Sequence, residues 1–192
     1  MKVSLNLNNL IIDHNYYGGN QDWYNSYIKR LAGCGPTTAS TITMYELNKN
    51  NYKEYTKEEF ISLMQELWNY ITPGMRGVDT VSKYKDGYDK YLKTSNLELS
   101  KSKILILEDS SIDEVEDYLI EAINSDHPVA FLNLNNGSEN QIDSWHWTTI
   151  VSIEKDDSYI YVNVCDEGLL KKVNLSNWIK TSNNGSFIYY YK

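Results

Sequence analysis

Apolar residues recur every three or four positions along much of the first half of the chain. Between residues 60 and 71 this spacing is regular, and Thr56 with Glu59 forms a capping box directly ahead of it. Two further helices are predicted over residues 36–49, where a proline occupies the first turn, and over 78–92. The first half is therefore expected to be helical.

In the second half, short apolar runs alternate with polar turn residues, which is typical of strands. Ser111 and Glu114 form a second capping box, which predicts one more helix over residues 112–125. The run at 103–109 is almost continuous in apolar residues, so we expect a buried strand there. The other predicted strands are residues 128–134, 146–155, 158–165, 169–175 and 186–192, with a short helix over 175–180.

Helices followed by an antiparallel sheet predict the α+β class. A chain of 192 residues is long enough to bury one core, and no linker or repeat divides it. We therefore expect a single domain over residues 1–192, with a helical half at about 1–95 and a sheet half at about 96–192.

Composition and charge exclude several classes of partner. The formal net charge is −8 and the isoelectric point is about 4.9, without a dense Lys/Arg cluster, so nucleic acid is not an expected partner. The chain has no apolar run of the roughly 18 residues that a membrane helix requires, so no membrane is expected either. The first residues lack the features of a signal peptide, which favours a cytoplasmic location.

The metal-binding residue types are sparse. Two cysteines and three histidines are scattered along the chain, without the close pair spacing of a zinc site. We expect no metal and no organic cofactor.

One cysteine stands in an unusual context, the segment Gly33-Cys34-Gly35-Pro36. Proline in a first turn places Cys34 at the start of a helix, where free N–H groups and the helix dipole favour a thiolate. Gly33 and Gly35 would let a substrate backbone approach the sulfur, and the Cys34 N–H could donate to an oxyanion. The alternative is a cysteine buried as a small apolar residue.

Of the three histidines, His146 is the best candidate for a partner of the thiolate. His14 lies in a polar stretch that is expected to be a surface loop, and His127 precedes a proline at a helix-to-strand turn. His146 begins a strand after a polar loop, a position from which a side chain can face a cleft. The alternative is a core histidine held between Trp145 and Trp147.

A Gly-Cys-Gly-Pro helix start, followed more than a hundred residues later by His-Trp at a strand start, resembles the papain-like cysteine peptidases. The segment is most similar to the bacterial branch with a GCGPT-type nucleophile segment, which is related to the bacteriocin-leader (double-glycine) peptidases. The specific motifs cover about residues 18–40 and 143–168. The resemblance implies a papain-like fold, a peptide or protein substrate, Cys34 as the nucleophile and His146 as the general base.

The resemblance also implies a glutamine upstream of the cysteine that donates to the oxyanion. Gln21 is the candidate, and Asn20 and Asn25 are the alternatives. Gln21 stands farther from Cys34 than is usual in the family, so residues 22–33 must fold back for its amide to reach the sulfur.

The third member of the site, Asn or Asp in the family, is expected on the strand after the histidine. Asn163 and Asp166 are both available, and we favour Asp166 because it stands where the strand ends. Cys-Asp-Glu-Gly replaces the Asn-Ser-Trp-Gly segment of many papain relatives here. Asp166 could instead serve only to start a turn before Gly168, and Cys165 is expected to pack in the strand.

The function implied is that of a cysteine peptidase or amide hydrolase acting through an acyl-thioester intermediate. The alternative is a catalytically divergent papain-fold protein that serves as a peptide-binding module or an acyltransferase. An interaction protein without chemistry is a third possibility, which rests only on acidity and tyrosine content.

Overall fold

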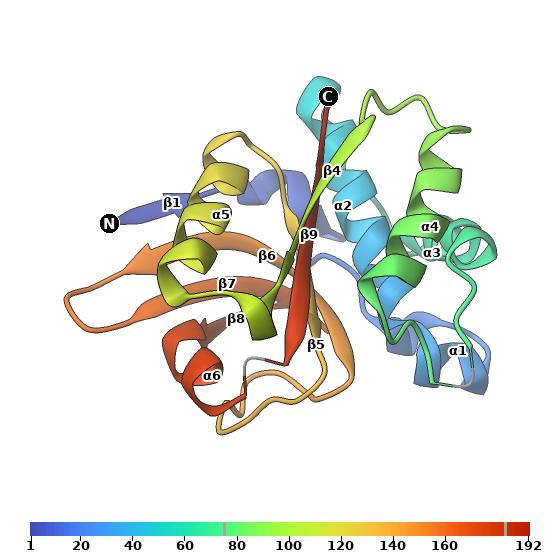
Figure 1. Cartoon of the computed structure of the whole chain (residues 1–192). Coiled ribbons are helices and arrows are strands. Elements are labelled where there is room, and N and C mark those ends of the chain that lie inside the picture. Colours follow the sequence, from blue (N-terminus) through green and yellow to red (C-terminus); the bar gives the residue numbers. More distant parts are fainter. Residues whose placement is uncertain (75, 183) are drawn as a thin grey trace.

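The computed structural model of the chain describes residues 1–74, 76–182 and 184–192. Most helices gather on one side and a large sheet lies on the other (Figure 1). The helices are α1 (Tyr27–Ala32), α2 (Cys34–Asn50), α3 (Lys57–Tyr70), α4 (Val81–Leu92), α5 (Ile112–Asn124) and α6 (Leu175–Thr181), with short 3-10 helices at Leu7–Leu10, Gln21–Trp23 and Leu107–Asp109. The predicted α+β class is confirmed. Among these described residues, none of the helices combines the length and the apolar character needed to cross a membrane.

The main sheet is antiparallel, with the strand order β4-β9-β5-β6-β7-β8. Strand β1 pairs with the far half of β6, beyond the part of β6 that pairs with β5. The strands are β1 (Lys2–Ser4), β4 (Lys101–Ile106), β5 (Val129–Asn133), β6 (His146–Lys155), β7 (Ile160–Asp166), β8 (Leu169–Asn174) and β9 (Gly185–Tyr191), and β2 (Ile11–Ile12) with β3 (Tyr16–Tyr17) forms a small second sheet. The predicted helical half, residues 1–95, thus contributes its first strand to the sheet.

Local capping signals fix the starts of the helices. Both predicted capping boxes form, at Thr56 before α3 and at Ser111 before α5. Helix α4 begins at Val81 rather than at 78, because the Thr80 side chain accepts a hydrogen bond from the Lys83 N–H.

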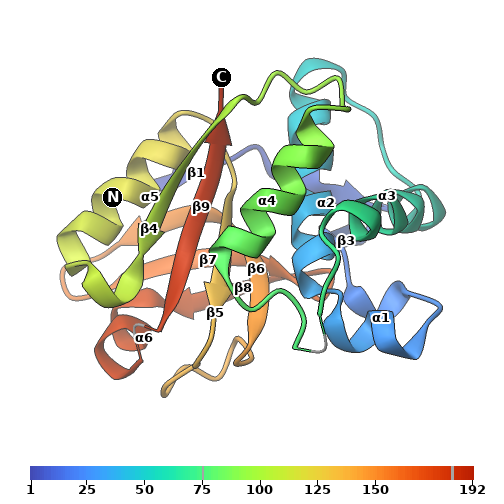
Figure 2. The same ribbon diagram turned by 45° about the vertical axis from the view of Figure 1, so that its right-hand side comes forward.

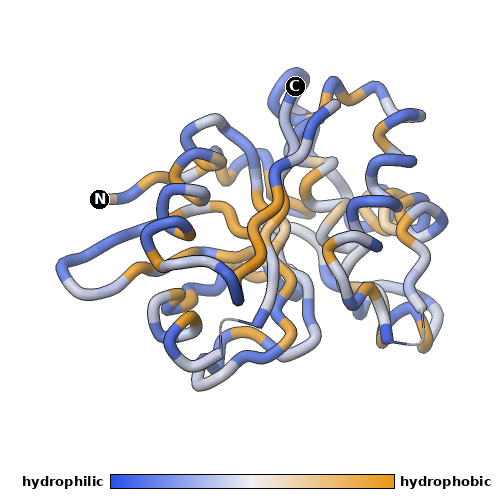
Figure 3. The backbone as a smooth tube through the Cα atoms, in the orientation of Figure 1, coloured by the Kyte–Doolittle hydropathy of each residue, from blue (hydrophilic) through white to orange (hydrophobic). Residues whose placement is uncertain are grey.

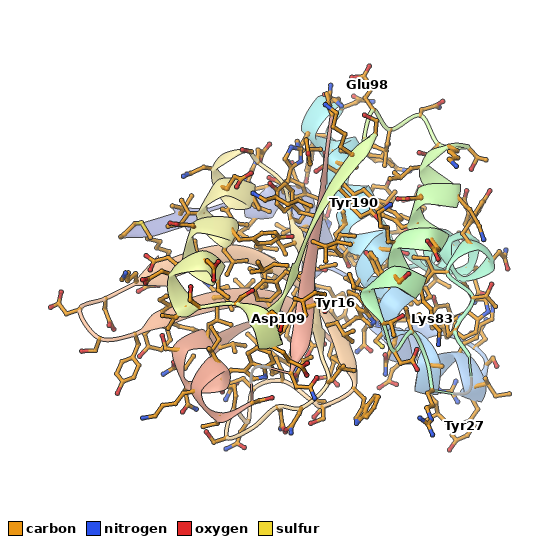
Figure 4. The ribbon with its side chains drawn as sticks, in the orientation of Figure 1. Tyr16, Tyr27, Lys83, Glu98, Asp109 and Tyr190 are labelled. Carbon is orange, nitrogen blue, oxygen red and sulfur yellow. The ribbon has the colours of Figure 1, made fainter. Side chains whose placement is uncertain are left out.

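Helices cover both faces of the central strands, as the view in Figure 2 shows. In β5, Phe131 belongs to the apolar cluster that includes residues of α5 and α6, whereas Leu132 belongs to the cluster that includes residues of α2 and α4. In β9, Tyr190 points toward α4 (Figure 4) and packs edge-on against Tyr88, with ring centroids 4.9 Å apart. Because both faces are buried, β5 is apolar from Val129 to Leu132 (Figure 3), and β9 has Phe187 and Ile188 at its centre followed by tyrosines.

The expectation of a buried strand at residues 103–109 is wrong. Strand β4 lies at the edge of the sheet and pairs only with β9, and Ile104 and Ile106 are 37% and 40% exposed. Residues 107–109 form a 3-10 helix instead of continuing the strand. An apolar run alone does not distinguish a central strand from an edge strand, because burial depends on which neighbours arrive from elsewhere in the chain.

Helix α1 was not predicted. It is short, and its apolar side chains Tyr27, Ile28 and Leu31 are each about two-thirds exposed. Tyr27 lies on the outer side of the helix, away from the sheet (Figure 4). Only Gly33 separates α1 from α2, so α1 helps to determine where the thiol-bearing end of α2 lies.

Candidate active site

Cys34 is the first residue of α2, as the sequence predicts. Its backbone N–H has no acceptor inside the helix, because the first N–H groups of a helix lack a partner one turn earlier. Pro36 lies in the same first turn, where its missing N–H removes no helical hydrogen bond. The thiol therefore stands at the electropositive end of the longest helix.

The two glycines beside Cys34 have a different role from the expected one. A Cβ on Gly33 would lie 2.4 Å from the Lys29 carbonyl and 2.5 Å from the Tyr24 ring. A Cβ on Gly35 would lie 2.8 Å from the Val78 side chain. The space that the missing side chains leave is filled by the protein itself, so these glycines allow close internal packing rather than the approach of a substrate backbone.

His146 and Asp166 form a close pair in the sheet half. His146 is the first residue of β6 and Asp166 the last of the neighbouring strand β7. The imidazole Nε2 lies 2.6 Å from Asp166 Oδ1, and the two side chains are 11% and 4% exposed. Lys171, from β8, contacts the other carboxylate oxygen at 2.8 Å. Both oxygens of Asp166 thus have a partner, and the carboxylate orientation is fixed.

This environment favours a charged imidazole. Burial lowers the pKa of His146, but the Asp166 carboxylate and the Cys34 side chain raise it more, to about 10. Burial raises the pKa of Asp166, but His146 and Lys171 lower it below its usual range. An ionised carboxylate next to a protonated ring is the expected state at neutral pH.

Cys34 and His146 line the same small pocket between the start of α2 and the ends of β6 and β7. The pocket has a volume of about 20 Å³, enough for one water molecule, and Cys34 is 7% exposed. Its lining residues are Gly19, Gln21, Cys34, Thr37, Thr38, Thr41, His146, Trp147, Thr149, Cys165, Asp166 and Glu167. The structure thus brings four candidate residues, Gln21, Cys34, His146 and Asp166, to one pocket.

Gln21 reaches this pocket and its two alternatives do not. It begins a 3-10 helix, and its Oε1 atom is buried without a hydrogen-bond partner among the described residues. Both ends of the Asn20 amide are occupied, because its oxygen accepts from the Asp22 N–H and its nitrogen donates to the Glu167 carbonyl. Asn25 is exposed. The intervening residues therefore fold back as the resemblance requires.

The other residues weighed in the sequence analysis do not take part in the pair of His146 and Asp166. Asn163 donates to Ser152 at 2.7 Å and makes no contact with His146. Cys165 is 6% exposed, and burial raises the pKa of its thiol, as expected for a packed cysteine. His14 lies in an exposed turn beside Glu54, and the His127 Nδ1 contacts Glu46 at 3.1 Å.

The pocket offers further polar atoms but no metal site. The hydroxyl oxygens of Thr37 and Thr149 are buried without a partner among the described residues, so they are available to a bound molecule. Within residues 1–74, 76–182 and 184–192, no group of three or more His, Cys, Asp or Glu side chains is arranged to hold a metal ion.

Lys171 is the site residue that the sequence did not suggest. Glu167 and Gly168 form a tight hairpin turn, with φ angles of 54° and 76°. The turn brings β8 back alongside β7, with Asp166 opposite Leu169. Lys171 is two residues after Leu169 and therefore lies on the same face of β8, next to Asp166. Recognition of this two-residue turn in the sequence would have been enough to place Lys171 near Asp166.

No family model matches the chain, and no curated protein sequence matches it. Its fold, however, matches solved structures over nearly its whole length. UfSP from C. elegans superimposes with a TM-score of 0.56 over 98% of this chain, at 12% identity. Procathepsin L 3 from the larval midgut of Tenebrio molitor gives 0.57 over 97%, at 14% identity. The fold is papain-like.

The chain is shorter than these neighbours. It spans 33% of the UfSP chain and 68% of the procathepsin chain. At sequence identities of 12% and 14%, the likeness shows the fold and not the activity. The similarity to bacterial double-glycine peptidases stays a prediction.

Proposed function

We propose that the chain is a cysteine peptidase or amide hydrolase, with Cys34 as the nucleophile and His146 as the general acid and base. The observation that carries the proposal is the pocket that both side chains line, with Asp166 bound at 2.6 Å to the ring nitrogen Nε2. A nucleophile, a base and a group that orients the base are what nucleophilic catalysis requires. The papain-like neighbours support a peptide or protein as the substrate.

In the acylation step, the Cys34 thiolate attacks the carbonyl carbon of the scissile amide and a C–S bond forms. The carbonyl oxygen becomes an oxyanion, for which the Cys34 N–H and the Gln21 amide are the proposed donors. The C–N bond then breaks, and protonated His146 gives its proton to the departing amine. An acyl-thioester remains on Cys34.

In the deacylation step, neutral His146 takes a proton from water, and the resulting hydroxide attacks the thioester carbon. The C–S bond breaks, the acid product leaves, and the thiolate–imidazolium pair is restored. Asp166 holds the ring through Nε2, which leaves Nδ1 for proton transfer. The cycle needs no cofactor.

Selective alkylation tests the nucleophile. We expect iodoacetamide to label Cys34 well below pH 8, because the proposed mechanism pairs the Cys34 sulfur with the charged imidazole of His146. His146→Ala should remove the labelling at low pH, whereas Cys165→Ala should leave it unchanged because burial raises the pKa of the Cys165 thiol. Labelling that follows an ordinary thiol and ignores His146→Ala would contradict the proposal.

Hydrolysis of a generic peptide library tests the activity. We expect new N-termini to be released by the unmodified chain and not by Cys34→Ala. Release of acyl groups to an added amine, without new carboxyl ends, would instead indicate an acyltransferase. Peptide binding together with an unreactive Cys34 would indicate a binding module.

A further inference from the structure

A second, larger cavity is lined by Trp145, the residue that immediately precedes His146 in the chain. It has a volume of about 450 Å³, and Arg76 and Trp145 line it among the described residues. Trp145 immediately precedes His146 and is 60% exposed, whereas Trp147 on the other side of His146 is 2% exposed. Cavities of this size accommodate side chains of a bound ligand.

The backbone of Trp145 is held in an unfavourable conformation. Its φ angle is 59°, in the left-handed region, where a bulky side chain costs about 1–2 kcal/mol. Burial of the indole does not offset this cost, because most of the ring remains in solvent. A strained residue with an exposed aromatic ring next to a proposed catalytic histidine points to a role in binding.

Arg76, which also lines the cavity, lies in the connection between α3 and α4. Gly74 and Gly77 exchange two backbone hydrogen bonds, of 3.1 and 3.0 Å, and so form a tight turn that carries Arg76. A Cβ on Gly77 would lie 3.7 Å from the Ala32 carbonyl, two residues before Cys34. The turn is thus packed against the segment that presents the thiol.

The next residue connects this turn to the sheet half. The Val78 carbonyl accepts a hydrogen bond of 2.6 Å from the Trp147 indole N–H. Arg76 and Trp145 therefore come from the same two sides of the molecule that supply Cys34 and His146.

The guanidinium of Arg76 is available to a ligand. Asp79, the nearest carboxylate along the chain, forms an ion pair with Lys83; Lys83, and to a smaller extent Arg76, lower the pKa of Asp79, but no ion pair to Arg76 forms in the part of the chain that the structure describes. Arg76 is exposed in a chain with a formal net charge of −8. A planar guanidinium is well suited to bind a carboxylate in two hydrogen bonds.

We propose that Arg76 and Trp145 form a specificity subsite for an acidic peptide, whose carboxylate binds Arg76 while an adjoining apolar group packs on the Trp145 ring. This inference rests on the proposed function, because it names the substrate class of that site. The carboxylate can belong to an Asp or Glu side chain or to the C-terminus of the peptide.

Peptide binding to Cys34→Ala tests the subsite without requiring catalysis. Short peptides are compared in pairs that differ only in Glu or Gln at one position, and in a second series only in a free or amidated C-terminus. Binding is followed through the emission of the exposed Trp145. We expect one acidic member to bind about fivefold more tightly than its neutral partner, as an accessible ion pair allows, and the two series distinguish the source of the carboxylate.

Variants assign the effect to the two residues. In the Cys34→Ala background, Arg76→Gln should reduce the acidic-to-neutral ratio to about one, and Arg76→Glu should invert it. Lys101→Gln, which removes an exposed positive charge from edge strand β4, should keep the ratio of about five. Trp145→Asn tolerates the left-handed backbone but removes the ring, so both members of a pair should bind more weakly; binding is then followed by calorimetry.

Equal binding of every pair, absence of binding, or a ratio that survives Arg76→Gln would overturn the subsite. The proposed function is judged separately, from hydrolysis and Cys34 alkylation in the unsubstituted chain. If hydrolysis occurs without an acidic preference, only the subsite fails. If selective binding occurs without hydrolysis, only the peptidase proposal fails.

Discussion

Replacing Asp166 by Asn removes the charge that favours a protonated His146 and keeps an oxygen that can accept from the ring. The pKa of His146 is raised from 6.5 to about 10, and at 1.36 kcal/mol per pKa unit this corresponds to about 5 kcal/mol in favour of the charged ring. A hydrogen bond to a charged group contributes about 1.5–3 kcal/mol, against about 1 kcal/mol for a neutral pair. Asp166→Asn should therefore lower the pKa of His146 by about one unit.

The pH dependence of kcat/KM measures this change. Acylation requires protonated His146 to give its proton to the leaving amine, so the rate should fall as the pH rises through the pKa of His146. We expect the midpoint of this alkaline fall in kcat/KM near pH 10 for the unmodified chain. For Asp166→Asn we expect it about one pH unit lower. Activity at neutral pH should change little by comparison, because the ring stays protonated there.

Asn163→Ala is the matched control, because Asn163 lies on the same strand but binds Ser152 instead of His146. It should leave the alkaline limb where it is. Identical limbs for Asp166→Asn and the unmodified chain, with both proteins folded by circular dichroism, would refute the reasoning that the carboxylate holds the proton on the ring.

Four further substitutions test other parts of the site. Gln21→Ala should lower kcat by about 100-fold with little change in KM, since an oxyanion donor acts mainly in the transition state; an unchanged kcat in steady-state kinetics would exclude it from that role. Gly33→Ala should lower the free energy of unfolding in urea by about 2 kcal/mol, because the new Cβ would meet a backbone carbonyl at 2.4 Å. Gly35→Ala should lower it by less, because its Cβ meets only side chains. Equal losses of unfolding free energy for the two variants would contradict this. Lys171→Met should destabilise the chain at pH 7, because Lys171 helps to keep the pKa of Asp166 below 3.8. A carboxyl group whose pKa is lowered by folding stabilises the folded state at pH values above its ordinary pKa, and this stabilisation is lost as the pH falls. The difference in the free energy of unfolding between the unmodified chain and Lys171→Met should therefore shrink below about pH 3.8. A difference that is the same at pH 7 and at pH 3 would contradict the ion pair.

Some of the site could be predicted because its signals are local. Pro36 in a first turn places Cys34 at a helix start whatever the rest of the chain does. Local signals also locate the strand that contains Asn163 and ends at Asp166. They do not decide which of these two residues is the partner of His146. Only the pairing of β6 with β7 decides between them, because its register places Asn163 opposite Ser152 and leaves Asp166 at the end of the strand that lies near His146.

The sequence by itself determined where most helices and strands begin, because caps, turns and apolar spacing act through hydrogen bonds between residues a few positions apart. The capping boxes at Thr56 and Ser111 are examples. Only the tertiary structure decided that β4 is an exposed edge, that β1 joins β6, and that the space beside Gly33 is filled by Tyr24. Those outcomes depend on contacts between segments that are distant in the sequence. The burial of apolar surface that selects such contacts is non-directional, so a local sequence pattern does not specify which segments meet.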